Sequence, residues 1–240
     1  RFFGAPFLLP IETRFDHSLE EVTPPADEAA TSEPRAAQTR KRTRIQQEKE
    51  RVILNAALDV FSENGFRGTT IDQIAQQAGL SKPNLLYYFR TKEDVHRCLL
   101  DRLLDNWLEP LRQMQPDGDP LSEIRSYMRR KLELARDYPR ESRMFANEMI
   151  RGAPHLTEEL KDLKALVDEK AAVMRAWMAS GKLATCDPHH LIFSIWATTQ
   201  HYADFDTQVR VVLARAGEGD GRFEDAARFL DRLYLEGLKP

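Results

Sequence analysis

Cysteine is scarce in this sequence, and long apolar runs are missing. The 240 residues contain two cysteines, Cys98 and Cys186, which lie far apart and form no C-x-x-C pair. A disulfide framework is therefore not expected, and we predict a chain that works in the reducing cytoplasm. No apolar run approaches the roughly 18–20 residues that a membrane helix needs, so a membrane span is not expected either.

Signatures of catalysis are missing as well. The sequence has no G-x-S-x-G, no glycine-rich phosphate loop and no cysteine–histidine signature. Such motifs place a nucleophile or a phosphate in many enzyme folds. We predict that the chain is not an enzyme and needs no cofactor. A helical enzyme is the alternative, and turnover of a bound ligand would favour it.

The sequence does have an ordinary globular composition, with an uneven distribution of charge. Apolar residues make up 42% and charged residues 30%, and glycine and proline are too few for a fibrous chain. Residues 1–34 carry 2 basic and 7 acidic side chains, whereas residues 35–97 carry 12 basic and 7 acidic ones. Residues 98–240 carry 21 basic and 24 acidic ones. A basic segment between acidic neighbours indicates a polyanionic partner.

These three segments are also the predicted regions of the chain. Residues 1–34 are rich in Pro, Glu, Ala and Thr without periodicity, which predicts a disordered leader. Residues 35–97 open with a basic arm, and residues 98–240 form the remainder. Apolar residues then recur at helical spacing without a strand pattern, so we predict an all-α fold. The expected helices are 45–64, 70–79, one capped by Ser81, one from Thr91 ended by Pro110, 120–137, 139–151, 157–180, 188–208 and 222–236.

The segment AQQAGLSKPNLLYYF, residues 75–89, lies across two short helices and a tight turn. Thr70 and Gln73 form a capping box for the first helix, and Ser81 caps the second. Gly79 permits the left-handed backbone that a sharp turn needs. This arrangement matches a helix-turn-helix. A plain αα-corner is the alternative, but the basic arm, the caps and the charge shift favour DNA binding.

The second short helix places polar and aromatic side chains opposite its apolar face. Asparagine can bond base edges, lysine and tyrosine hydroxyls reach phosphates, and proline or tyrosine carbons can contact a thymine methyl. Backbone N–H groups at helix N-termini also favour phosphate. The predicted DNA contacts are Thr70, Ser81, Lys82, Pro83, Asn84, Tyr87, Tyr88 and Lys92, together with Arg40, Lys41, Arg42 and Arg44 of the arm.

The stretch FSENGFRGTTIDQIAQQAGLSKPNLLYYFRTKEDV resembles the N-terminal domain of TetR-type regulators. It contains aromatic-x-x-x-G, T-x-x-x-I-A, A-G-x-S, an aromatic cluster and K-E in that order. The resemblance implies a homodimeric, all-α repressor that binds double-stranded operator DNA and holds a small molecule in its C-terminal domain. Leu86 departs from the pattern, because many members place a phosphate-contacting tyrosine there. That contact then falls to Tyr87 or is absent.

The second half resembles the pyrimidine-utilisation regulators within this family. The resemblance rests on NWLEPL, RDYP, GAP, LKALVDEK, SGKLA and above all DPHHLIFSIWATTQHYADF. It implies uracil or thymine as an effector that releases the DNA, and it implies Trp107, Trp196 and Gln200 as pocket residues. The alternative within the family is a regulator of another aromatic or metabolite ligand.

The residues themselves allow such a pocket without requiring it. Trp196, Gln200 and Asp204 recur every four residues, so they share one face of a helix. A tryptophan plane one turn from an amide suits a planar lactam ring. An unpartnered buried glutamine would cost about 1–3 kcal/mol. The alternative is a core tryptophan beside a glutamine that bonds a neighbouring helix.

Histidines give the weakest signal in the sequence. His189 and His190 diverge on a helix, whereas His201 and Asp204 share a face. We interpret all four as solvated or capping groups, and we predict no metal site. Trp177 and its neighbouring methionines are interpreted as helix packing. A helical protein-interaction module remains an alternative, which salt-dependent binding of duplex DNA would exclude.

Overall fold

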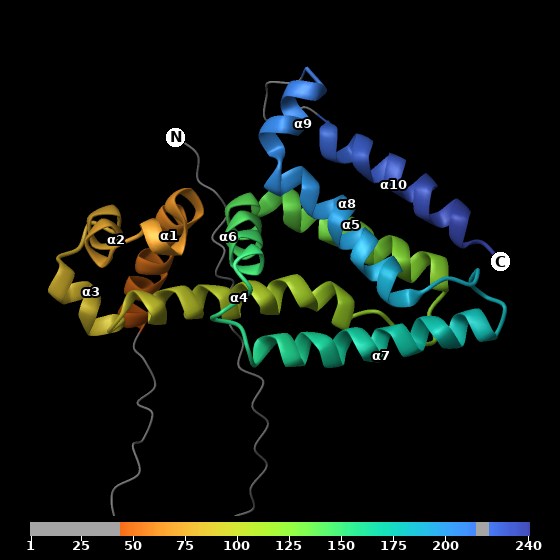
Figure 1. Cartoon of the computed structure of the whole chain (residues 1–240), viewed down its shortest axis with the longest axis horizontal. Coiled ribbons are helices and arrows are strands. Elements are labelled where there is room, and N and C mark those ends of the chain that lie inside the picture. Colours follow the sequence, from red (N-terminus) through yellow and green to blue (C-terminus); the bar gives the residue numbers. More distant parts are fainter. Residues whose placement is uncertain (1–43, 215–220) are drawn as a thin grey trace, which may run out of the picture. The chain divides into compact units, whose positions relative to one another are not determined.

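The computed structural model describes residues 44–214 and 221–240, and every regular element in these ranges is an α-helix (Figure 1). The predicted leader, residues 1–34, and the arm residues Arg40, Lys41 and Arg42 lie outside the described residues. The chain divides into two units between Arg51 and Val52, and the second unit runs from Val52 to Pro240. The helices are α1 (Arg44–Gly68), α2 (Ile71–Gln77), α3 (Lys82–Tyr88), α4 (Lys92–Arg112), α5 (Pro120–Asp137), α6 (Pro139–Ile150), α7 (Glu159–Ala179), α8 (Pro188–Asp204), α9 (Asp206–Val212) and α10 (Arg222–Leu238).

The end of α1 is broken where the sequence predicts a stop. Gly65 has φ 64° and ψ 175°, which is not helical, and one further turn follows it up to Gly68. A Cβ at Gly65 would also meet the Arg151 guanidinium at 2.9 Å. The positive φ therefore favours glycine here, because the flexible Arg151 side chain can shift away from an added Cβ but the backbone angle cannot. The break turns the chain toward α2.

Most predicted boundaries agree with the structure within two residues, but two predictions were wrong. Pro110 lies inside α4 and does not end it. Proline removes one helical hydrogen bond, and burial of Pro110 and of Leu111, which is 0% exposed, offsets that loss. The expected helix 188–208 is two helices, because Phe205 (φ −117°, ψ 31°) separates α8 from α9. The sequence offered no glycine or proline at this break.

Two clusters of buried side chains support the second unit. One lies under α2, α3 and the start of α4, and contains Phe61, Ile74, Leu85 and Leu99. The other lies between α5, α7, α8 and α10, and contains Trp177 and Met174, as predicted for packing residues. In Figure 1, α4 and α7 run side by side while α8 crosses α5. No described helix is both long and apolar enough to cross a membrane.

Candidate functional site

The turn between α2 and α3 is built by helix caps. Thr70 Oγ1 accepts a bond from the Gln73 N–H, and Gln73 Oε1 accepts one from the Thr70 N–H at 2.7 Å. Gly79 has φ 64°, the left-handed value that the sequence predicts for it. Ser81 Oγ accepts from the Asn84 N–H at 3.4 Å. These bonds satisfy N–H groups that the first turn of a helix leaves without partners.

A small apolar core fixes α3 against α2. Ile74 and Leu85 are 0% exposed, and Ala75 is nearly buried where the two helices cross. Phe89 closes the end of this core, while Ile71 and Leu80 pack at its edge. Leu85 faces inward, whereas Asn84 and Tyr87 are exposed and Leu86 is half-buried. The sequence predicted this arrangement from spacing alone.

The outward face of α3 carries the predicted contacts. Lys82, Pro83, Asn84 and Tyr87 are exposed, and Tyr87 keeps 72% of its surface accessible. Tyr88 is half-buried and meets the Tyr87 ring edge-on at 5.2 Å. An exposed aromatic and an exposed amide on one short helix match what a recognition helix presents to base edges and phosphates.

Two of the lysines predicted to contact DNA already interact with other residues of this chain. Lys82 Nζ lies 2.9 Å from Asp72 Oδ2, and both side chains are exposed. Lys92 Nζ donates to the Phe66 and Thr69 carbonyls at 2.9 Å each and lies over the Phe66 ring. Lys92 therefore closes the α1–α2 turn. Arg44, the described residue of the predicted arm contacts, is the exposed first residue of α1.

A second set of polar groups meets in the interior between α4, α5, α6 and α8. Trp107 of α4 is 4% exposed, and Lys131 of α5 is 3% exposed, with Nζ 5.2 Å from the Trp107 ring centroid. Ser142 of α6 donates to Asp204 of α8 at 2.6 Å. Burial lowers the pKa of Lys131 to about 7, and attraction to Asp204 opposes that shift. The four helices thus converge on a buried, partly charged cluster.

The predicted face of α8 lines this cluster. Trp196 Nε1 donates to the Tyr127 hydroxyl, and Asp204 attracts Lys131 one turn further along α5. Gln200 lies between Trp196 and Asp204 on the same face of α8 and is half-buried. The structure brings Trp196 into contact with α5 through Tyr127, whereas the role of Gln200 stays a prediction.

Several buried polar atoms in this region have no hydrogen-bond partner among the described residues. They are Trp107 Nε1 and both carboxylate oxygens of Glu141, which is 2% exposed. Glu141 forms a long ion pair with Arg140, whose Nη2 lies 3.9 Å from Oε1. Burial raises the pKa of Glu141 and of Asp204. Unpaired buried groups cost about 1–3 kcal/mol each, and a polar ligand that bonds them would recover that cost.

Sequence reasoning missed Tyr127, Lys131 and Glu141. A signal for the first two was present, because Tyr127 and Lys131 are four residues apart on the apolar face of α5. A lysine on an apolar face is unusual unless its charge has a function. Glu141 in the first turn of α6 resembled an ordinary N-terminal acid. Its burial depends on α6 packing against α8, which spacing along the chain does not reveal.

The histidines of α8 have separate surroundings. His189 Nε2 lies 3.0 Å from Asp168, and His201 stacks on Phe205. Asp204 bonds Ser142 instead of a histidine. The α8 histidines therefore form no shared cluster in the described part of the chain.

The helix-turn-helix and the arrangement of the helices behind it are typical of a DNA-binding transcriptional regulator. Residues 53–97 match the model of the bacterial regulatory proteins, tetR family, and residues 100–240 match that of the YcdC-like protein C-terminal region. The chain belongs to the TetR family of transcriptional regulators, as the sequence motifs predicted, and it is not an enzyme.

One relative matches most of the chain. The HTH-type transcriptional regulator RutR of Escherichia coli strain K12 is 50% identical over 203 residues, which cover 84% of this chain and 96% of the relative. A TetR-like regulator from Rhodococcus sp. RHA1 superposes with a TM-score of 0.60 at 21% identity, over 82% of this chain and 98% of that one. AibR, crystallised with isovaleryl coenzyme A and operator DNA, gives a TM-score of 0.60 at 19% identity, over 77% and 97%. The two structures support the fold alone.

Proposed function

We propose that this chain is a homodimeric repressor whose operator binding is released by uracil or thymine, and that it controls pyrimidine metabolism. The observation that supports the proposal is the buried pair of Trp107 and Lys131, with Trp107 Nε1 left without a hydrogen-bond partner among the described residues. The likeness to RutR supports the same conclusion. Such a regulator would act in the cytoplasm, on the nucleoid when bound to DNA.

The chemistry of the cluster suits a flat ring with several carbonyl and N–H groups. Gln200 offers one acceptor and two donors in a fixed plane, which complement the adjacent N–H and C=O of uracil. Lys131 offers a donor to a second carbonyl, and a tryptophan supplies a flat apolar surface for the ring face. Cytosine replaces one carbonyl with an amino group and lacks a ring N–H. It would therefore leave a buried group unpaired.

The DNA side of the proposal uses the exposed face of α3. Asn84 reads a base edge in the major groove, while Lys82, Tyr87 and the N-termini at Thr70 and Ser81 position the phosphates. Residues 35–97 then form the DNA-binding domain, and residues 98–240 form the effector and dimerisation domain. The basic arm, including Arg44, contributes sequence-independent affinity through phosphate contacts.

The proposed dimer uses an apolar face shared by α8 and α10. Phe193 is 48% exposed on α8, and Phe229 and Leu233 are 54% and 52% exposed on α10. These three large apolar side chains are exposed to solvent and could pack against a partner. A second copy is the proposed partner, because two helix-turn-helix units bind half-sites about 34–36 Å apart on one face of the duplex.

The test combines ligand calorimetry with DNA binding to a duplex that the protein selects from a random pool. Uracil or thymine should bind, cytosine much more weakly, and the ligand should lower DNA affinity by the same factor by which DNA lowers ligand affinity. Gln200→Ala should cost about 1–3 kcal/mol of ligand binding and leave ligand-free DNA binding unchanged. Gln208→Ala, an exposed glutamine on α9, is the control.

A lack of binding at millimolar uracil and thymine would remove the pyrimidine effector. The family alternative, a repressor that senses another aromatic or metabolite ligand, would then be tested by a thermal-shift panel. A ligand at 100 times its dissociation constant stabilises the native state by about 2.7 kcal/mol.

A further inference from the structure

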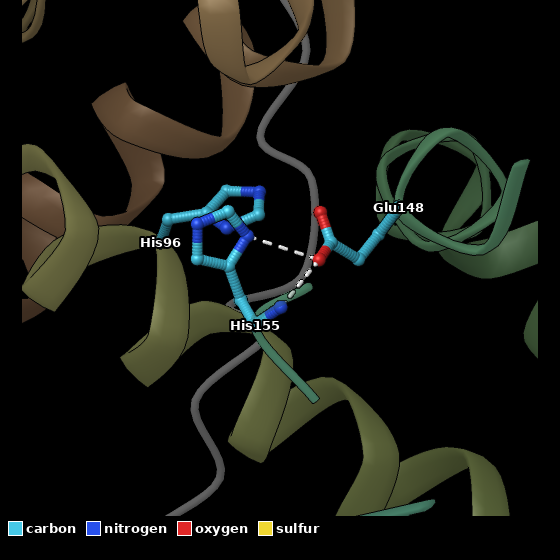
Figure 2. Close-up of side chains that lie close together, drawn as sticks. All are labelled: His96, Glu148 and His155. Carbon is cyan, nitrogen blue, oxygen red and sulfur yellow. Dashed lines mark hydrogen bonds and ion pairs between the residues drawn. The ribbon is translucent and has the colours of Figure 1, made fainter. Parts of the chain in front are cut away.

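Three potential metal ligands meet near the start of α4, away from the effector cluster. They are His96 of α4, Glu148 of α6 and His155 of the loop between α6 and α7 (Figure 2). One ligand atom from each residue lies within 4.8 Å of the others. Trp107 lies eleven residues beyond His96 on α4, or about 16 Å along the helix. The two sites are therefore separate.

His96 is a buried imidazole with an unused ring atom. It is 2% exposed, and its Nδ1 has no hydrogen-bond partner among the described residues. The rings of Phe61 and Phe66 lie 4.8 Å from it, and burial lowers its pKa to about 4. The neutral imidazole is the form that binds metal ions. An unpaired imidazole nitrogen in an apolar wall is costly unless a ligand uses it.

Glu148 and His155 are already held together by the fold. Glu148 Oε1 accepts from the His155 backbone N–H at 3.0 Å and lies 3.0 Å from His155 Nδ1. The Glu148 carbonyl accepts from the Arg151 and Ala153 N–H groups. This loop therefore folds around the carboxylate, and Figure 2 shows both imidazole rings on the same side of it. His155 retains 19% of its side-chain exposure, which gives a small ion access.

We propose that His96, Glu148 and His155 form a binding site for a divalent transition-metal ion of the zinc class. Two imidazole nitrogens and one carboxylate oxygen are a ligand set that Zn²⁺ uses, with water in the fourth position. Tetrahedral bonds of about 2.1 Å place ligand atoms about 3.4 Å apart. Because no two of the ligand atoms lie more than 4.8 Å apart, the side chains need to move by at most about 1.4 Å to surround the ion. Mg²⁺ and Ca²⁺ prefer oxygen ligands and should not compete.

The test uses the full-length, untagged protein after removal of metals. Zn²⁺ titrated by calorimetry should bind with one ion per chain, and Co²⁺ should give the intense visible absorption of a low-symmetry, four-coordinate site. His155→Ala should weaken Zn²⁺ binding at least about tenfold, which is the lower end of losses for metal-site variants. Mg²⁺ at millimolar concentration should leave the Zn²⁺ isotherm unchanged.

His189→Ala is a matched control, because His189 Nε2 also lies 3.0 Å from a carboxylate but has no second imidazole in its cluster. It should retain wild-type Zn²⁺ affinity. Equal affinities of wild type and His155→Ala would overturn the proposal, as would a loss in His189→Ala alone. Zn²⁺ that fails to bind the wild type at millimolar concentration would also overturn it. Glu148→Gln, which keeps an acceptor for the loop, should lose affinity as His155→Ala does, and an unchanged affinity would count against the site.

Discussion

The helix-turn-helix and the cluster around Lys131 use polar side chains in opposite ways. On α3 the functional groups are exposed, and the residue between them, Leu85, is buried in a fully apolar core. Around Lys131 the polar groups themselves are buried, and Trp107 Nε1 and Glu141 have no hydrogen-bond partners in the described chain. The exposed face of α3 therefore carries no cost of unpaired buried groups, whereas the interior cluster does.

This difference concerns the free-energy cost of desolvating polar side chains when the chain folds. A surface that binds a large polyanion gains affinity from charged side chains that are already exposed to water. Folding pays no desolvation cost to place these side chains. A site for a small molecule must remove its polar groups from water beforehand. That requirement destabilises the ligand-free fold and gives the ligand its differential affinity for one state.

The largest effect is expected from removing the apolar support of α3. Leu85→Ala empties a site that is 0% exposed and should lower the free energy of unfolding by about 2–5 kcal/mol. Chemical denaturation measures this loss, and DNA affinity should fall with it. Leu86→Ala, at a half-buried position one residue away, is the control and should cost clearly less. Equal losses would mean that α3 is not anchored through Leu85.

The opposite sign is expected in the interior cluster. Lys131→Met replaces a buried cation by an apolar side chain of similar length and should raise the free energy of unfolding at pH 7 by about 1–4 kcal/mol. Under the proposed function it should also weaken effector binding. Arg130→Met, at the exposed neighbouring position, should change stability little. A destabilised Lys131→Met protein would contradict the comparison between the two regions.

Lys131 should also make the free energy of unfolding depend on pH. Its pKa is about 7 in the folded chain against an ordinary value of 10.5, so the unfolded chain binds more protons between these values. The contribution of Lys131 to stability is thus greatest above pH 10.5 and is lost as the pH falls toward 7. The difference in unfolding free energy between Lys131→Met and wild type should therefore shrink as pH rises from 7 to 10. A difference that stays constant would show that Lys131 is not desolvated.

A smaller and purely functional effect is expected at Asn84. Asn84→Ala removes an exposed amide and should cost about 1–3 kcal/mol on the selected duplex and little on random DNA. Arg44→Ala is the contrasting variant, since it should weaken both duplexes alike and reduce the salt slope by about 0.9. If Asn84→Ala weakens both duplexes equally, Asn84 contacts phosphate and does not read a base.

The smallest effect is expected at the cap of α2. Thr70→Ala removes the oxygen that accepts from the Gln73 N–H and should lower the free energy of unfolding by about 0.5–2 kcal/mol. Thr70→Ser keeps that acceptor and should be near wild type in thermal denaturation. If both variants lose the same amount, the methyl group and not the hydrogen bond is what matters.

The sequence predicted the helix-turn-helix in detail because its determinants are local. Thr70, Gly79 and Ser81 act on neighbours within four residues, so spacing alone identifies them. The interior cluster depends on contacts between helices that are distant in sequence. Gln200 and Trp196 were predicted through family motifs and stay predictions, whereas the burial of Lys131 and Glu141 is created only by the packed helices. The cluster of His96, Glu148 and His155 was missed for the same reason.

Helix α4 is unbroken from Lys92 to Arg112, with Pro110 absorbed near its end. Trp107 lies fifteen residues after Lys92, which corresponds to about 22 Å along the axis. Over that length a helix acts as a stiff lever. A tilt of about 5° at the Trp107 end displaces the other end by about 2 Å, enough to disturb hydrogen bonds whose usual range is about 2.7–3.2 Å. Lys92 holds the Phe66 and Thr69 carbonyls at that other end. A tilt of α4 at Trp107 would therefore change the distances at which Lys92 holds the α1–α2 turn.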